Sequence, residues 1–563
     1  MSKIVETAEE QLRQTVLSAL GEAVAAGELP AEPIPAFAVE VPGDRAHGDF
    51  SANAAMVSAK AFRLPPRKIA ECILSHLTLD GTYFERAEAA GPGFLNFFLS
   101  PAFYAAVVAD VLAQGERYGR SDFGQGKRVM VEFVSANPTG PMHMGNARGG
   151  ALGDCLASVL DAAGYQVWRE FYVNDAGNQI EKFGVSLEAR YIQHFRGEDA
   201  VEFPEDAYHG DDIREHAANF AALYGDKYLD VPAEERRAAL VAYALPLNIE
   251  RMHRDLEKYR IVYDEWFLES SLHKSGAVQA VVDLLAEKGL TYEKDGAVWY
   301  KASENGGEKD EVLIRANGNP TYFAADIAYH RNKFERGFDT CIDVWGADHH
   351  GHVARMKGAM DAIGLDGSKL HVVLIQLVRL MQGGEVVRMS KRSGKAIQLS
   401  DLLDEVPVDA ARFFFNMREA STQMDFDLDL AVEQSSSNPV YYVQYAHARI
   451  CSIFKNLAAE GVTPRACGKA ELARLTSPEE KALIRHLADY TGEIVAAAKA
   501  YEPARITRYC LELATLFHKF YNTCRVKGEE EPLMQARLSL CAATRVTLEN
   551  ALALLKIDAP ESM

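Results

Sequence analysis

The stretch GKRVMVEFVSANPTGPMHMGNARGGALGD, residues 126–154, decides the fold class. Its β-rich run 129–134 ends in the breaker cluster NPTGP at 137–141, and a helical pattern then extends over about 144–163. The segment YQVWREFYVND, 165–175, predicts the next strand. This order of strand, loop, helix and strand is the repeating unit of a parallel α/β sheet.

A charged helical segment interrupts the α/β pattern. Residues from about 178 to 256 are acid-rich and helical in pattern, and we interpret them as a helical insertion. Strand candidates resume in VWY (298–300), TCIDVWG (340–346) and LHVVLIQLVRLM (370–381), the last taken as one strand. Residues 121–430 are therefore predicted to form one parallel-sheet domain that carries an inserted helical module.

The two ends of the chain follow different patterns. Nearly every segment of 431–563 is helical in pattern, which predicts an all-α bundle. Residues 1–120 mix an amphipathic N-terminal helix with the strand candidate GPGFLNFFLS, 91–100, which predicts a small α+β domain. Asp49 or Ser51 is predicted to cap a second helix in this domain.

The composition of the 563-residue chain is that of an ordinary globular protein, with 48% hydrophobic and 25% charged residues. No apolar run reaches the roughly 18 residues that cross a bilayer, and the acidic N-terminus does not resemble a secretory signal. Eight scattered cysteines without a CxxC predict free thiols in a reducing compartment. We therefore expect a cytoplasmic protein without a membrane partner.

The net charge of −20 argues against a nonspecific nucleic-acid binder, but the charge is unevenly distributed. Residues 431–563 carry 16 basic and 15 acidic side chains, whereas the first 430 residues carry 44 and 65. The C-terminal quarter is thus the part of the chain where acidic side chains repel the phosphates of a nucleic acid least.

Two loops carry the residue types of phosphate chemistry. In the Gly-rich stretch 138–154, His143 and Asn146 lie at a helix start, where their side chains and the helix dipole favour anions. A Gly-rich turn that serves only helix packing is the alternative. The second loop, RMSKRSGK at 388–395, contains four bases and no acid, and a solvated basic loop is its alternative. Both loops follow strands of what the pattern indicates is one sheet, so both can reach its carboxyl-end crevice.

These loops resemble the HIGH and KMSKS motifs of class I aminoacyl-tRNA synthetases, here His143-Met144-Gly145-Asn146 and Arg388-Met389-Ser390-Lys391-Arg392. The chain is similar to the bacterial arginyl-tRNA synthetase family in particular, through VEFVSANPTGPMHMGNARGGALGD, YVNDAGNQI, GADHHGHVARMKGAM, DAARFFF and YVQYAHARICSI. The resemblance spans nearly the whole chain and is weakest at 185–260 and 460–500. Asn146 departs from the second His of HIGH, and Arg388 from the first Lys of KMSKS.

The resemblance implies a Rossmann-type catalytic domain that forms arginyl-adenylate from ATP and L-arginine and transfers arginine to the 3′ end of tRNA(Arg). It implies Mg²⁺ carried by the ATP phosphates without a dedicated protein site, and a monomer. It assigns catalysis to His143, Asn146, Arg388 and Lys391, and ATP binding to Pro141, Met142, Gly145, Met389, Ser390 and Arg392. A noncatalytic tRNA-binding paralogue and another class I synthetase are the alternatives.

The chemistry of arginine suggests which side chains bind it. A guanidinium prefers carboxylates that accept bidentate charge-assisted hydrogen bonds. The family motifs place Glu269 and Asp326 at the guanidinium, with Tyr322 one helical turn before Asp326, and Asn137 at the α-amino or carboxylate end. Glu132 fits the same pocket or, equally, a structural salt bridge.

The cluster Asp348-His349-His350-Gly351-His352 allows two interpretations. Three histidines and an acid have the ligand types of a zinc site, but no separated fourth ligand is present. In the family this stretch borders the arginine and adenosine pocket, which favours His349 as an arginine-site residue. Further candidates near the pocket are Ser135, Asn174 and Asp175.

The two terminal domains are the candidates for tRNA contact. The C-terminal helices mix aromatic and basic residues, and the resemblance makes them an anticodon-binding domain in which bases stack on aromatics. The candidates there are Tyr442, Tyr445, Arg449, Tyr521 and Arg525, with helix-core packing as the alternative. The N-terminal segment around Asp49, Phe50 and Asn53 resembles the family's extra domain, which contacts the outer corner of tRNA; a stabilising cap is the alternative.

Overall fold

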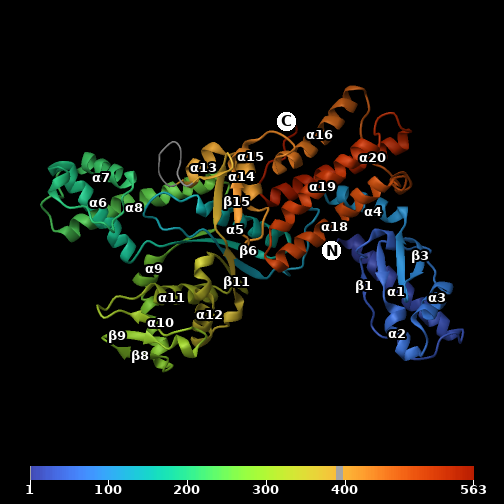
Figure 1. The fold of residues 1–563 in the computed structure, drawn as a ribbon, viewed down its shortest axis with the longest axis horizontal. Coiled ribbons are helices and arrows are strands. Elements are labelled where there is room, and N and C mark those ends of the chain that lie inside the picture. The colour runs from blue at the N-terminus through green and yellow to red at the C-terminus, as the bar shows by residue number, and fades with distance from the viewer. Residues whose placement is uncertain (1, 388–396) are drawn as a thin grey trace.

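The structure, a computed structural model, describes residues 2–387 and 397–563. Its centre is a five-stranded parallel sheet in the order β12-β11-β5-β6-β7 (Figure 1). The strands are β5 (Arg128–Glu132), β6 (Gln166–Val173), β7 (Glu265–Leu268), β11 (Thr340–Gly346) and β12 (Leu370–Ile375). The parallel α/β sheet expected from the sequence is confirmed. From β5 the chain adds β6 and β7 on one side, and β11 and β12 lie on the other side. The boundary between β5 and β11 is therefore the switch point of the sheet, which is where such sheets bind ligands.

Helix α5 (Gly145–Ala162) connects β5 to β6 and packs tightly against the end of β5. A Cβ atom added at Gly153 would lie 2.3 Å from the Phe133 ring, so only glycine allows this approach. The chain turns immediately after β5, with Val134 and Ser135 at φ 71° and 44°. A β-branched residue in the left-handed region is strained, and this strain lies where the chain leaves the sheet for the first motif.

The predicted single strand at 370–381 is wrong. The chain leaves the main sheet at Ile375, and β13 (Val378–Gln382) joins a second sheet with β14 (Glu385–Val387) and β15 (Met424–Asp427). The backbone of Gln376 is bonded outside both sheets, because its N–H donates to Ala420 O and its carbonyl accepts from the buried Arg148. The basic loop therefore follows a strand of this small sheet and not of the main one.

The helical insertion is confirmed. It contains α6 (Asn178–Arg196), α7 (Asp211–Tyr224) and α8 (Ala233–Lys258), which share a small core of their own. A second lobe follows β7, and its antiparallel sheet β10-β9-β8 contains the strand expected at 298–300. The elements of this lobe are α9 (Glu269–Lys274), α10 (Ala277–Glu287), β8 (Thr291–Lys294), β9 (Ala297–Tyr300), β10 (Glu311–Ile314), α11 (Tyr322–Glu335) and α12 (His350–Ala362).

The C-terminal region is the predicted helical bundle (Figure 1, orange to red). Residues 438–563, all of which the structure describes, form helices and turns without a strand. The helices after the second motif are α13 (Leu399–Glu405), α14 (Val408–Phe415), α15 (Leu428–Val432), α16 (Pro439–Ala459), α17 (Lys469–Leu472), α18 (Pro478–Ala500), α19 (Ala504–Thr523) and α20 (Glu531–Leu554).

The N-terminal domain is α+β, as predicted, around an antiparallel sheet β1-β2-β4-β3. Its elements are α1 (Lys3–Ala25), β1 (Val39–Glu40), β2 (Phe50–Ala52), α2 (Ala54–Phe62), α3 (Pro66–Ser75), β3 (Phe84–Ala90), β4 (Phe94–Leu99) and α4 (Pro101–Gln114). The predicted cap by Asp49 or Ser51 is wrong, because β2 intervenes and Asn53 occupies the N-cap of α2. Helix α4 packs against α17, α18 and α20 and so joins this domain to the bundle.

In the described part of the chain, no helix has the length and apolarity needed to span a membrane.

Candidate active site

The turn after β5 presents hydrogen-bond donors at the switch point of the sheet. His143 is exposed, and its Nδ1 accepts the N–H of Gly145 at 3.1 Å. This bond leaves Nε2–H of a neutral ring free to donate outward. The N-terminus of α5 follows directly and has no side-chain cap. Such a turn is suited to bind anionic oxygens.

The chain just after the second motif pairs with this turn. Met144 N–H donates to Ile397 O at 3.0 Å, and Leu399 N–H donates to Met142 O at 2.9 Å. His143 and Gln398 thereby form an isolated β-bridge. The motif residues themselves lie outside the described residues, namely Arg388, Met389, Ser390, Lys391 and Arg392. The described chain that follows the second motif therefore lies against the first, although β14, which precedes that motif, belongs to a different sheet from β5.

The remaining ATP-binding candidates contribute in different ways. Met142 is 2% exposed, so the turn presents its backbone and not its side chain. Pro141 and Asn146 are partly buried, whereas Gly145 is exposed and uses its N–H for His143. The insertion supports the turn from outside, because Asn248 donates to Pro138 O at 3.0 Å and Arg251 donates to Gln398 Oε1 at 3.1 Å.

Glu269, one of the predicted arginine-binding acids, lies where β6 and β7 end. It is 3% exposed at the start of α9, and burial raises its pKa. Burial, with contributions from Glu269 and Asp326, also raises the pKa of Tyr172 on β6. Asn174, with its amide turned to donate, lies 2.6 Å from Glu269 Oε2.

Asp326 lies on α11 and is held by two histidines. His330 Nδ1 is 3.1 Å from Asp326 Oδ1, and His352 Nε2 donates to Asp326 Oδ2. Burial opposes ionisation, but His330 and His352 outweigh it and hold the pKa of Asp326 well below its usual range. Tyr322, one turn earlier on α11, is 48% exposed beside Gly177. An ionised carboxylate and an exposed ring thus lie on adjacent turns of α11.

Glu132 lies in a buried ion pair. Its carboxylate pairs with Lys333, which is 0% exposed, and also accepts from Ser135 Oγ at 2.8 Å. Of the two interpretations of Glu132 from the sequence, these contacts favour the structural salt bridge. Asn137 is instead exposed at the carboxyl end of β5, where it is accessible to a ligand.

The histidine cluster divides between surface and site. His349 is 59% exposed and 3.7 Å from Asp348, whereas His352 contacts Asp326. Within the described ranges, one group of potential metal ligands is compact, namely Glu28, Cys72 and His76 of the N-terminal domain. The Cys72 thiol donates to Glu28 Oε2, and His76 Nε2 lies 3.3 Å from the same oxygen.

Sequence reasoning missed His330, Lys333, His352 and Tyr172. Asp326, His330 and Lys333 are spaced i, i+4 and i+7, which puts them on one face of α11. This spacing could have predicted that the three side chains lie together. Nothing in the sequence indicated the contact of His352, because it joins α12 to α11 across the lobe.

Four of the predicted tRNA-binding residues lie on α16 and α19, and the fifth, Arg525, lies just after the end of α19. The Arg449 guanidinium lies 4.8 Å from the centre of the Tyr445 ring and 4.9 Å from that of Tyr521, and both rings are more than a third exposed. Tyr442 lies deeper, 5.0 Å from the His518 ring, and Arg525 is exposed. A cation between two accessible rings is an arrangement on which bases can stack.

The N-terminal residues singled out from the sequence are internal. Phe50 and Asp49 are 4% and 8% exposed, and Asn53 Oδ1 accepts from Ala38 N–H at 2.8 Å. Asp49 accepts from Leu99 N–H and pairs with Arg485 of α18 at 3.2 Å. These side chains hold the domain together and fasten it to the bundle, so any tRNA contact must come from other residues.

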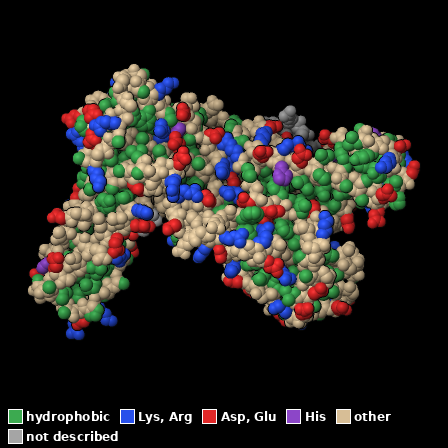
Figure 2. All heavy atoms as spheres, turned by 180° about the vertical axis from the view of Figure 1, so that it is seen from behind, with side chains coloured by type: hydrophobic (Ala, Val, Ile, Leu, Met, Phe, Trp, Pro, Cys, Tyr) green, Lys and Arg blue, Asp and Glu red, His purple; other side chains and the backbone are tan. Residues whose placement is uncertain are grey.

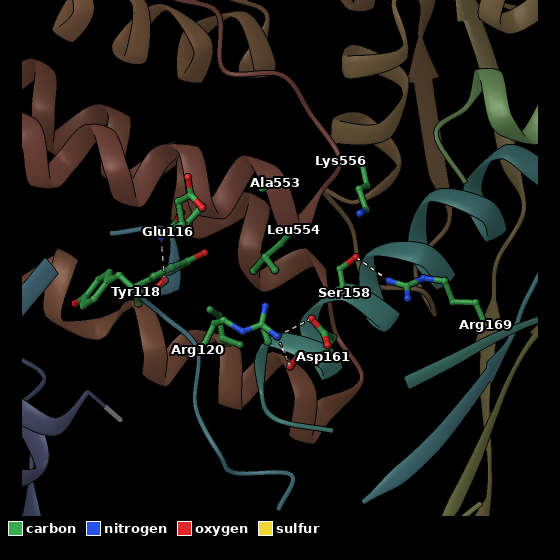
Figure 3. A pocket seen from close by; sticks show the side chains of 13 residues that line it. Glu116, Tyr118, Arg120, Ser158, Asp161, Arg169, Ala553, Leu554 and Lys556 are labelled. Atoms are coloured by element: carbon green, nitrogen blue, oxygen red, sulfur yellow. Dashed lines mark hydrogen bonds and ion pairs between the residues drawn. The ribbon is translucent and has the colours of Figure 1, made fainter. Parts of the chain in front are cut away.

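A cavity of about 420 Å³ lies between the sheet and the bundle (Figure 3). Figure 3 shows Arg120 turned toward Asp161 and Arg169 toward Ser158, with Lys556 above Ser158 in this view. Ser158 and Asp161 belong to the last turns of α5, whereas the His143 turn precedes its first turn. The cavity is thus remote from the switch point and does not belong to the crevice described above.

A parallel sheet with its switch point between β5 and β11, and a His143 turn paired with the chain that follows a second basic motif, define the catalytic fold of a class I aminoacyl-tRNA synthetase. Family models match three successive regions. They are described as arginyl tRNA synthetase N terminal domain (residues 10–99), tRNA synthetases class I (R), catalytic domain (107–452) and DALR anticodon binding domain (443–563).

Full-length relatives agree with these matches. The chain is 56% identical to an arginine–tRNA ligase of Ruminiclostridium cellulolyticum and 57% identical to that of Caldanaerobacter subterraneus subsp. tengcongensis, with 100% of both chains covered in each case. Its fold is similar to that of Thermus thermophilus arginyl-tRNA synthetase, with a TM-score of 0.71 at 24% identity over 98% of this chain and 100% of that one. The chain belongs to the arginyl-tRNA synthetase family.

Proposed function

We propose that this chain activates L-arginine with ATP in the crevice between β5 and β11 and transfers the arginyl group to the 3′ end of tRNA(Arg). The observation that carries the proposal is that Glu269 directly follows β7 and lies against Asn174 just after β6, while Asp326 on α11 is held by His330 and His352. A pair of carboxylates suits a planar guanidinium better than any uncharged side chain. The names of the full-length relatives agree with this substrate.

In the first step the arginine carboxylate attacks the α-phosphorus of ATP and pyrophosphate leaves. The attacking group belongs to the substrate, so the protein contributes orientation and charge stabilisation. His143 Nε2–H, the Asn146 amide and the N-terminus of α5 donate to phosphate oxygens, and Arg388 and Lys391 neutralise the charge that passes to pyrophosphate. Pro141, Met142 and Gly145 shape the turn under the nucleotide, together with Met389, Ser390 and Arg392 of the second motif.

The amino acid lies across the carboxyl ends of the strands. Glu269 and Asp326 bind its guanidinium, Tyr322 covers it, and Asn137 holds the α-amino or carboxylate end. His349 lies at the rim of this pocket, and Glu132 supports it from below through its pair with Lys333. This arrangement holds the carboxylate of arginine near the turn that binds ATP.

A magnesium ion bound with ATP would supply positive charge at the phosphates. The side chains of His143 and Asn146 can donate hydrogen bonds to phosphate oxygens, so we propose no dedicated protein site for the ion at this turn.

The bundle binds tRNA through Tyr442, Tyr445, Arg449, Tyr521 and Arg525. Figure 2 shows basic side chains among acidic ones near the middle of one face, which gives the nucleic acid local phosphate contacts despite the net charge of −20. We propose that the protein acts as a monomer in the cytoplasm.

ATP–pyrophosphate exchange with each of the twenty amino acids, with and without tRNA(Arg), tests the proposal. We expect exchange with arginine alone, and only when tRNA is present, as the family resemblance implies. Exchange with another amino acid at a comparable rate contradicts the assigned substrate. Absence of exchange with every amino acid in the presence of tRNA(Arg) indicates a noncatalytic tRNA-binding protein.

A further inference from the structure

A group of charged side chains, mostly buried, connects α11 to the central sheet. We call this group the row, and its members are Asp326, His330, Lys333, Glu132 and Asp343. His330 and Lys333 follow Asp326 at i+4 and i+7, and their side chains are 1% and 0% exposed. Lys333 Nζ pairs with Glu132 on β5 and lies 2.7 Å from Asp343 Oδ1 on β11. The row therefore connects α11 to the two strands that flank the switch point.

His330 is the bridge between Asp326 and the rest of this row. Its Nε2 is 2.7 Å from Asp343 Oδ2, and its Nδ1 is 3.1 Å from Asp326 Oδ1. Its Nδ1 also lies 2.9 Å from the backbone carbonyl oxygen of Asp326, so both ring nitrogens face acceptors; the ring therefore donates at both ends and carries a positive charge. Burial and the nearby Lys333 oppose that charge, but Asp326 and Asp343 outweigh them and raise the pKa of His330 to about 10.

His352, the other histidine on Asp326, adds no charge. Its Nδ1 accepts from Arg355 Nε at 2.8 Å, so the proton must be on Nε2, which donates to Asp326. Arg355 in turn pairs with Glu311 at 2.5 Å, and these two charges cancel. His352 orients Asp326 without neutralising it.

The row contains one more acid than bases: its acids are Glu132, Asp326 and Asp343, and its bases are Lys333 and His330. Burial raises the pKa of Glu132, but the contacts of its carboxylate with Lys333 and with the Ser135 hydroxyl favour the ionised form, so the row has one unmatched negative charge. The side chain of Asp326 is 30% exposed, whereas the other four are at most 8% exposed. The unmatched negative charge therefore lies at the one member of the row that a ligand can reach.

We propose that His330 is a positioning residue for amino-acid recognition. It bridges Asp326 to Asp343, which in turn pairs with Lys333. The row then presents one negative charge at the crevice, and a guanidinium neutralises that charge. This inference rests on the proposed function and deepens it. A neutral isostere such as citrulline would leave the charge unmatched and the hydrogen bonds of Asp326 incomplete. Selectivity against uncharged analogues is strong when a buried polar group loses its partner.

His330→Gln tests the bridge, because glutamine keeps a hydrogen-bonding side chain and removes the positive charge. In ATP–pyrophosphate exchange with tRNA(Arg), we expect the KM for arginine to rise about tenfold or more while the KM for ATP stays within about twofold. The ratio of the citrulline inhibition constant to the arginine KM should fall about fivefold or more. His194→Gln, at an exposed histidine of α6, is the matched control and should change neither value.

A purely structural His330 would give a different result. If folded His330→Gln protein keeps the arginine KM and the citrulline ratio of the wild type, or if both substrate KM values rise equally, the proposal is wrong. The wild type is the separate check on the proposed function. If it fails to activate arginine, the function itself is misassigned, whereas arginine activation with an unaffected His330→Gln variant overturns the positioning role alone.

A measurement on the unmodified protein keeps the test decisive if the variant does not fold. The charged groups that face His330 are Asp326 and Lys333 on α11, Asp343 on β11 and, farther away, Glu132 on β5. With its pKa raised to about 10, His330 stays charged at neutral and acidic pH, so the arginine KM should be flat between about pH 5.5 and 8. A change in this KM with a midpoint near pH 6.5, the ordinary value for histidine, would overturn the proposal.

Discussion

Replacing Asp326 with asparagine removes the negative charge of the side chain and changes the hydrogen bonds that its two oxygen atoms accept. In the wild type, one carboxylate oxygen faces His330 at 3.1 Å and the other accepts from His352. Asparagine has the same shape, but its amide oxygen can satisfy only one of these donors, and its NH₂ group then faces the other N–H. The variant therefore loses the negative charge offered to the substrate and one of the bonds that orient the side chain.

The expected size of the effect follows from these contacts. A hydrogen bond to a charged group contributes about 1.5–3 kcal/mol. Since about 1.4 kcal/mol is tenfold in an equilibrium constant, the affinity for arginine should fall about 10- to 150-fold. Asp326 lies on α11 whereas the turn proposed to bind phosphate follows β5, so the KM for ATP should change by about twofold or less.

Stability gives a second readout of the same substitution. The pKa of Asp326 is lowered in the folded protein, so its ion pair stabilises the fold above the unfolded-state pKa of about 3.9 and ceases to do so as the pH falls through the folded-state pKa. Asp326→Asn should therefore lower the free energy of unfolding at pH 7. The difference from wild type should shrink as the solution is made acidic.

Exchange kinetics over a range of arginine concentrations, with calorimetry for ATP binding, measure these effects. Asp348→Asn is the control, because Asp348 is an acid of the same lobe with an 83% exposed side chain. Equal losses of arginine and ATP affinity in the Asp326 variant would mean that this residue is structural. An arginine KM within about twofold of wild type would refute its assignment to the guanidinium.

Three further predictions concern other parts of the chain. Lys391→Ala should lower the kcat of adenylate formation about a hundredfold or more and leave arginine affinity nearly unchanged, and a kcat within about twofold of wild type in rapid-quench assays would contradict its role. Gly153→Ala should lower the free energy of unfolding by about 1–3 kcal/mol, because its Cβ would meet Phe133 at 2.3 Å; chemical denaturation checks this against Gly351→Ala, where nothing lies within 4 Å. A chain that begins at Ser100, and so keeps α4 on the bundle, should show a KM for tRNA raised about tenfold, or about 1.4 kcal/mol, with unchanged arginine affinity; an unchanged KM for tRNA in aminoacylation assays would exclude a binding role for the N-terminal domain.

The sequence was informative where local chemistry decides the structure. Breakers after a β-rich run located the turn at His143, and helical periodicity placed α5 within a residue or two of its ends. It was misleading at 370–381, where apolar character continues but the strand does not, because Arg148 binds the carbonyl of Gln376 from a helix more than two hundred residues earlier. A contact of that sequence separation leaves no trace in local periodicity.

The roles of individual acids were harder to predict for a related reason. For Glu132 the sequence left two interpretations open, and its pair with Lys333 favours the structural one. Lys333 lies between Glu132 and Asp343 in the interior, whereas His330 lies between Asp343 and the more exposed Asp326. These contacts depend on the packing of α11 against β5 and β11, which the local sequence does not reveal.

Contacts between segments that are distant in the sequence also bring the two signature motifs together. The second motif is preceded by β14 of the small sheet and followed by Ile397, whose carbonyl pairs with the first motif. Arg148 of α5 donates to the carbonyls of Gln376, Glu419 and Thr422, which precede β13 and β15 of that sheet. Arg251 of the insertion adds a bond to the neighbouring Gln398. The relative position of the motifs is therefore supported by backbone bonds between the first motif and the chain after the second, and by two arginines outside both motifs. Because neither arginine donates to the described turn at His143, their removal should disturb the alignment of the motifs more than the affinity of the turn for ATP.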